Sequence, residues 1–200
     1  MAAPRPAVAR PFTLMDAMIL IAATAVALPG ARIMMIGIGV ASPGESLSGA
    51  LIDLCADGDY KGAGALLAYL SALVAAAWTV AVIPLRLRRP RPPWRRLGRQ
   101  PGFIAASAAA LALTLLILVI ARAWMVKGVA AFFVGDIELS LVVLGPSLAG
   151  AAVLGSWTTL ILGRRWRAEA SWPDRLGRAL GAYWIAMGLG APALAGWIFY

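Results

Sequence analysis

The sequence contains no histidine and a single cysteine, Cys55, and both shortages exclude whole classes of functional site. A chain without histidine cannot build a His-based metal site or a His-dependent catalytic triad. One cysteine cannot form an intrachain disulfide. The HExxH and GxSxG motifs and a Gly-rich phosphate loop are missing as well. We therefore expect no catalytic residues, no metal ligands and no cofactor, and we predict that the protein is not an enzyme.

Charged residues are also scarce, because they make up 14% of the 200 residues while hydrophobic residues make up 62%. Soluble domains carry roughly a quarter charged residues, so this composition predicts an integral membrane protein. The net charge of +9 is concentrated in short segments, where membrane topology explains it without a nucleic acid partner. The abundance of arginine and alanine is typical of a GC-rich bacterial genome, and the expected location is the bacterial cytoplasmic (inner) membrane.

Five apolar runs are long enough to cross the ~30 Å hydrocarbon core of a bilayer as helices. They cover residues 14–40, 62–85, 103–126, 139–162 and 180–200. The predicted fold class is therefore all-α, a single integral membrane helical bundle with five transmembrane helices. Pro29-Gly30 interrupts the first run, which should tilt, kink or end early. Pro84 marks the end of the second run.

Two basic loops, residues 86–102 and 163–179, set the expected orientation. The first holds seven arginines, the second holds five and the tail of residues 1–11 holds two, which is fourteen of the eighteen basic residues. Short loops rich in Lys and Arg stay in the cytoplasm, so we predict the N-terminus inside and the C-terminus outside. The acidic segment 41–61 should lie outside, with Leu47–Leu54 as one or two helical turns on the membrane surface.

The N-terminal segment has an alternative interpretation as a cleaved signal peptide. Its basic region, apolar region and cleavage site would be Arg5 with Arg10, Ala17–Leu28, and the small residues near Ala27 or Ala31. Asp16, at the start of the apolar run, argues against cleavage.

The segment Pro11–Leu28, with its Phe-x-Leu-x-Asp-Ala-Met start, resembles small multi-pass proteins encoded in planctomycete genomes. A weaker likeness extends to the Arg/Pro loop and the residues after it. The resemblance implies a lineage. Because that family has no assigned function, it implies no mechanism.

The segment 86–99, RLRRPRPPWRRLGR, carries more positive charge than orientation requires. Its prolines should keep the chain extended, and anionic head groups attract arginines next to a membrane. A tryptophan within it would anchor the loop at the head-group level. We therefore predict an anionic-lipid site formed by Arg88, Arg89, Arg91, Trp94, Arg95 and Arg96.

A second group of charges is expected at the outer face of the membrane. It comprises Arg32, Arg122, Asp136 and Glu138. Charges within a membrane are candidates for function when they are paired, so one interpretation is an ion-paired cluster. The other is that the two arginines extend to the interface on their own, and both interpretations stay open.

Two further patterns concern helix packing. Trp78, Trp157 and Trp184 should form an aromatic layer near the cytoplasmic ends of their runs, either packed between helices or facing lipid, or lining a quinone, pigment or lipid pocket. Small residues at four-residue spacing favour close packing inside one bundle over a dedicated dimer face. Examples are Gly102-Ala106-Ala110, Ala151-Gly155-Thr159 and Gly177-Gly181.

These features together predict a non-enzymatic multi-pass membrane protein that acts as a subunit, assembly factor or lipid-contacting scaffold of a membrane complex. The expected partners are anionic membrane lipids and either other membrane subunits or further copies of the chain. The alternative is a small channel or carrier. Asp16, Pro29-Gly30 and Gly145-Pro146 are its only indications, and five runs do not divide into equal inverted repeats.

Overall fold

The computed structural model describes residues 11–37, 46–56, 60–88, 93–127 and 143–199. Five long helices and two short ones form from these residues, and no strand occurs among them. The helices are α1 (Leu14–Gly37), α2 (Leu47–Ala56), α3 (Tyr60–Leu87), α4 (Trp94–Leu97), α5 (Pro101–Lys127), α7 (Gly145–Leu162) and α8 (Trp172–Phe199). The prediction of an all-α protein is confirmed.

Among the residues that the structure describes, three helices are long and apolar enough to cross a membrane. They are the segment Leu66–Leu87 of α3, the segment Pro101–Arg122 of α5, and α7. A shorter apolar segment, Leu14–Gly30, belongs to α1. The protein is therefore a helical chain suited to a membrane, whereas five spans and their orientation stay predictions.

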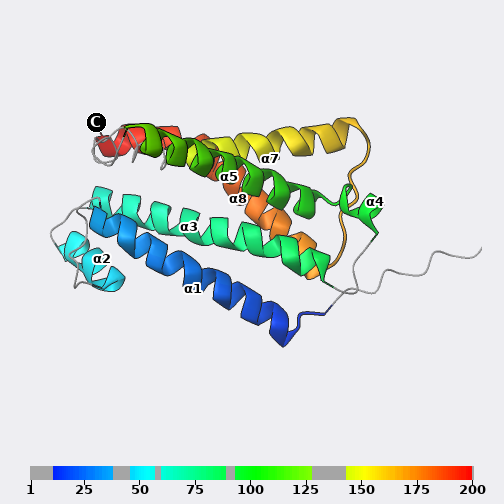
Figure 1. Cartoon of the computed structure of the whole chain (residues 1–200), viewed down its shortest axis with the longest axis horizontal. Helices are drawn as coiled ribbons and strands as arrows, with labels where there is room; N and C mark the ends of the chain where they lie inside the picture. Colours follow the sequence, from blue (N-terminus) through cyan, green and yellow to red (C-terminus); the bar gives the residue numbers. More distant parts are fainter. Residues whose placement is uncertain (1–10, 38–45, 57–59, 89–92, 128–142, 200) are drawn as a thin grey trace, which may run out of the picture.

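The helices form an elongated bundle (Figure 1). α5, α7 and α8 pack against one another, α3 lies against α5 and α8, and α1 packs along α3. At one end of the bundle α3 terminates, α5 and α8 begin, and α4 lies beside the connection of residues 163–171. We call this the basic end, because the arginines of α4, of that connection and of the first turns of α8 gather there.

Small residues let the helix backbones approach closely. A Cβ atom added to Gly177 would overlap the carbonyl oxygen of Gly102, and one added to Gly150 would lie 2.5 Å from the carbonyl oxygen of Trp184. The ridges that contain Gly102 and Gly177 therefore pack inside the bundle. The ridge around Gly155 is exposed instead, and no atom of another described helix lies within 4 Å of a Cβ placed there. The core beside these contacts comprises Ala75, Val82, Ala105, Ala106, Ala109, Ala149, Val153, Leu180 and Trp184.

α8 begins at Trp172, although the sequence predicts a loop over residues 163–179. The first turn explains the difference, because the Ser171 carbonyl accepts backbone hydrogen bonds from Asp174 at 3.1 Å and from Arg175 at 3.2 Å. Pro173 and an acidic residue in the first turn both favour a helix start. The side chains of residues 172–179 therefore project from a helix and not from a loop.

The prolines interrupt the chain less than expected. Pro29 lies inside α1, so that helix does not end there, and Pro84 lies inside α3, which continues to Leu87. The expectation that prolines keep the whole arginine loop extended is wrong for Trp94–Leu97, which form one helical turn after Pro93. The helical turns predicted at Leu47–Leu54 are present as α2.

Candidate functional site

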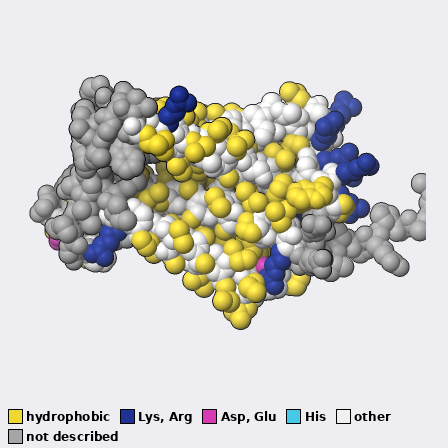
Figure 2. All heavy atoms as spheres, in the orientation of Figure 1, with side chains coloured by type: hydrophobic (Ala, Val, Ile, Leu, Met, Phe, Trp, Pro, Cys, Tyr) yellow, Lys and Arg dark blue, Asp and Glu magenta, His cyan; other side chains and the backbone are white. Residues whose placement is uncertain are grey.

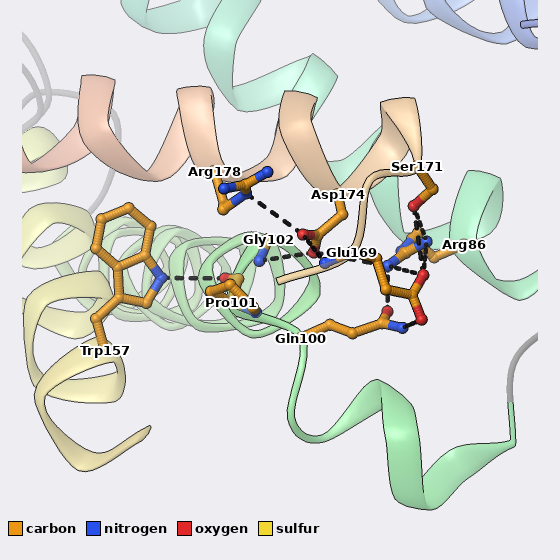
Figure 3. Close-up of polar contacts among 9 residues, drawn as sticks. All are labelled: Arg86, Gln100, Pro101, Gly102, Trp157, Glu169, Ser171, Asp174 and Arg178. Atoms are coloured by element: carbon orange, nitrogen blue, oxygen red, sulfur yellow. Dashed lines mark hydrogen bonds and ion pairs between the residues drawn. The ribbon is translucent and has the colours of Figure 1, made fainter. Parts of the chain in front are cut away.

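The structure places one arginine of the basic loop inside the bundle. Arg86 occupies the last turn of α3, and its side chain is only 4% exposed. Its Nη1 donates a hydrogen bond of 2.8 Å to Ser171 Oγ, and both Nη atoms lie 3.3 Å from Glu169 Oε2 (Figure 3). Its Nη2 also donates to the side-chain oxygen of Gln100. Arg86 thus joins the end of α3 to the residues that precede α5 and α8.

Asp174 forms the second centre of this group and is fully buried. Its carboxylate accepts the backbone N–H groups of Gly102 and Glu169, each at 3.1 Å, and Oδ2 lies 3.3 Å from Arg178 Nε (Figure 3). Oδ1 lies 3.6 Å from Arg86 Nη2. Burial raises the pKa of Asp174, while the backbone hydrogen bonds and the two arginines partly oppose that rise.

The residues around the start of α5 connect these two centres. The Gln100 side-chain amide donates to Glu169 Oε1, and the Trp157 indole donates to the Pro101 carbonyl at 3.0 Å. The Arg167 backbone N–H donates to the Arg99 carbonyl at 2.9 Å. We call the interacting set Arg86, Gln100, Glu169, Ser171, Asp174 and Arg178 the polar cluster.

The polar cluster balances its own charge, since two arginines face two carboxylates. Removing one member of a buried ion pair leaves an uncompensated charge that costs about 3–5 kcal/mol. The cluster is therefore a structural junction between helix ends. In the part of the chain that the structure describes, no group of three or more Cys, Asp or Glu residues could hold a metal ion.

Asp16 is the third carboxylate near the basic end, and it begins α1. It is fully buried and accepts the Thr13 backbone N–H at 3.0 Å, while its own N–H donates to Thr13 Oγ1 at 3.4 Å. This reciprocal pair is a capping box. Arg88 Nη1 lies 3.4 Å from Asp16 Oδ1 and ties α1 to the end of α3. Asp16 thus has a structural role, although its position in the sequence is also one of the indications of a carrier.

The predicted lipid-binding residues divide into three groups. Arg88 is 38% exposed and paired with Asp16. Trp94, Arg95 and Arg96 are exposed on α4. Arg89 and Arg91 lie outside the described residues.

The predicted outer charge cluster is described only in part. Arg32 in α1 and Arg122 in α5 are both exposed. Asp136 and Glu138 lie outside the described residues, so the ion-paired and the extended interpretations stay predictions.

The three tryptophans of the predicted layer pack between helices. Trp184 is 1% exposed and donates to Thr79 Oγ1 at 2.9 Å, linking α8 to α3. Trp78 donates to Thr24 Oγ1 at 2.8 Å and so links α3 to α1, while Trp157 makes the contact with Pro101 given above. Each indole N–H is satisfied across a helix contact, which favours the packing interpretation.

Sequence reasoning missed the polar cluster. One signal was present, because Glu169 and Asp174 are the only acidic residues in a loop that carries five arginines. The Ser-Trp-Pro-Asp segment that ends at Asp174 is a second signal, typical of a helix start. Nothing in the sequence marks Gln100 or distinguishes Arg86 from the six other arginines of its segment.

Comparisons with protein-family models, with curated proteins and with solved structures give no match. The likeness to planctomycete membrane proteins therefore stays a prediction, and any function must be argued from the geometry above.

Proposed function

We propose that this chain is a non-catalytic, multi-pass protein of the bacterial cytoplasmic membrane that acts as a lipid-contacting scaffold or subunit of a membrane complex. Its five long helices would span the membrane with the basic end in the cytoplasm. In this role the protein works through contacts with anionic lipids and with other membrane subunits.

The observation that supports this proposal is that exposed apolar side chains and exposed basic side chains occupy different parts of the bundle surface. Figure 2 shows a broad apolar surface along the helices and basic side chains at the end where α4 lies. Among the described residues, the exposed arginines of that end are Arg95, Arg96, Arg99, Arg164, Arg165, Arg167 and Arg175. Large apolar side chains are exposed on α1, α5 and α7, including Met18, Ile21, Leu115, Leu118, Leu154 and Ile161. An apolar surface fits acyl chains, and exposed arginines fit anionic head groups.

The arrangement of the buried polar groups favours a scaffold over a channel or carrier. Glu169 and Asp174 bind arginines and backbone N–H groups, and Thr79 accepts the Trp184 indole. These groups are engaged in contacts between helices. A carrier would instead need polar groups directed at a solute.

Purification in mild detergent followed by native mass spectrometry tests the proposal. We expect the protein to retain phosphatidylglycerol in preference to phosphatidylcholine and to carry other membrane proteins with it. Gln substitutions at Arg95, Arg96, Arg164, Arg165 and Arg167 should reduce lipid retention, because each arginine near an anionic surface contributes on the order of 1 kcal/mol.

The matched control is the double substitution Arg32→Gln and Arg122→Gln, which removes exposed arginines away from the basic end and should leave retention unchanged. Equal retention of the two lipids by the parent protein would contradict the proposal. Solute flux through proteoliposomes that contain only this chain would point to the channel or carrier instead.

A further inference from the structure

An open groove lies between α3 and α8 on the surface of the bundle, with a volume of about 530 Å³. Its α3 wall includes Leu67, Val74 and Trp78, and its α8 wall includes Leu176 and Ala179. The wall hydroxyls of Ser71 and Tyr183 hydrogen-bond to each other at 2.8 Å. Because these hydroxyls satisfy each other, the groove presents an almost wholly apolar surface. Its α3 wall belongs to Leu66–Leu87, one of the segments suited to cross a membrane.

The groove is long and its wall is apolar. From Leu67 to Trp78 the α3 wall extends about 16 Å, at ~1.5 Å per helical residue. A hydrocarbon chain that follows this wall would meet apolar side chains along its whole length.

A charged residue lies at the end of the groove nearest the basic end. Arg175 is exposed and lies one helical turn before Ala179 on the same side of α8. Helical side chains lean toward the helix N-terminus, so we expect its guanidinium to extend away from the apolar wall toward the basic end. An anionic head group at that level would meet Arg175 while an acyl chain follows the groove.

We propose that the groove between α3 and α8 binds one acyl chain of an anionic phospholipid, whose head group contacts Arg175. This inference rests on the proposed function, because it assigns a specific site to the lipid contact. It goes further in making one lipid part of the bundle surface, held between two helices and distinct from lipids attracted to the arginines of α4.

Photo-crosslinking provides the test. The full-length protein is reconstituted into vesicles of equal parts phosphatidylcholine and phosphatidylglycerol, with a trace of phosphatidylglycerol that carries a diazirine in its acyl chain. After illumination, the labelled peptides are identified by mass spectrometry. We expect labelling of the peptides that contain Val74, Trp78 and Leu176. The same diazirine chain on phosphatidylcholine should label them at least threefold less.

Two substitutions separate the apolar and the ionic contributions. Ala179→Trp fills the groove and should reduce labelling of these peptides at least threefold, whereas Ala151→Trp, at an exposed position on α7, should not change it. Arg175→Gln should remove the preference for phosphatidylglycerol in the groove. Arg122→Gln, which removes an exposed arginine of α5 away from the basic end, should keep that preference.

Different results would overturn the groove site and the proposed function. Labelling of the groove that is equal in the parent protein and in Ala179→Trp would overturn the groove site, even if the parent still enriches phosphatidylglycerol. Loss of all preference for phosphatidylglycerol by the parent, at the groove and at the peptides of α4 and 163–167, would overturn the proposed lipid role itself.

Discussion

Asp174 and Gly102 begin two different helices, and the carboxylate of the first accepts the backbone N–H of the second at 3.1 Å. The first N–H groups of a helix have no partner within the helix, and a negative charge near them is favourable. Asp174, in the first turn of α8, therefore provides a hydrogen-bond acceptor for an N–H group at the start of α5. This contact requires close backbones, since a Cβ atom at position 102 would lie 2.8 Å from Asp174 Oδ1.

Gly102→Ala should destabilise the protein. The added methyl group collides with Asp174, and an overpacked contact of this kind costs about 1–3 kcal/mol. Gly155→Ala is the matched control, because Gly155 is exposed within α7 and alanine is favoured there by roughly 0.5–1 kcal/mol. Chemical unfolding in detergent, followed by tryptophan fluorescence, should show opposite signs for the two variants. Equal effects would contradict the close contact.

The ion pair between Arg86 and Glu169 should be coupled energetically. Arg86→Gln alone leaves buried acceptors without their partner and should lower the free energy of unfolding by about 3–5 kcal/mol. When Arg86→Gln is combined with Glu169→Gln, the free energy of unfolding should fall by less than the sum of the two single losses. The difference should be about 0.5–3 kcal/mol. The exposed Arg95→Gln should change stability by less than about 0.5 kcal/mol. Strictly additive losses would show that the pair contributes nothing.

The stability of the protein should depend on pH through Asp174. Burial raises the pKa of this residue above its ordinary value of 3.8. Above that value the folded protein still binds a proton that the unfolded chain has lost. The contribution of Asp174 is therefore complete at pH values below 3.8 and is lost as pH rises through the higher folded pKa.

Asp174→Asn removes this titration and keeps a carbonyl oxygen for the Gly102 N–H. The free energy of unfolding of the parent, minus that of Asp174→Asn, should therefore fall as pH rises. Unfolding in detergent across a pH series measures this difference. A difference that grows with pH would mean that the arginines outweigh burial.

The predicted orientation places the basic end in the cytoplasm. An alkaline phosphatase fusion after Tyr200 should be active, because the enzyme folds outside the cytoplasm, and a fusion after Arg96 should be silent. Comparable expression of both fusions is the control. The reverse pattern of activity would refute the orientation and with it the cytoplasmic placement of the basic end.

The helices themselves could be predicted from local sequence. Runs such as 103–126 are long and apolar, and α5 covers that run. α8 starts earlier than the sequence predicts, because arginines dominate residues 163–179 and mask the start signal at Ser171 and Pro173. For Trp157 and Trp184 the sequence predicted a shared layer, yet their hydrogen-bond partners come from residues distant in the chain.

The sequence by itself determined that this protein is helical, suited to a membrane and basic at one end, because these properties follow from residues that are near one another in the chain. Only the tertiary structure decided which arginines are buried. Arg86 and Glu169 are separated by 83 positions and meet because α3, α5 and α8 converge. Arg95 has the same charge but lies on a short exposed helix. Helix packing, which no local pattern encodes, therefore separates a structural ion pair from a surface charge.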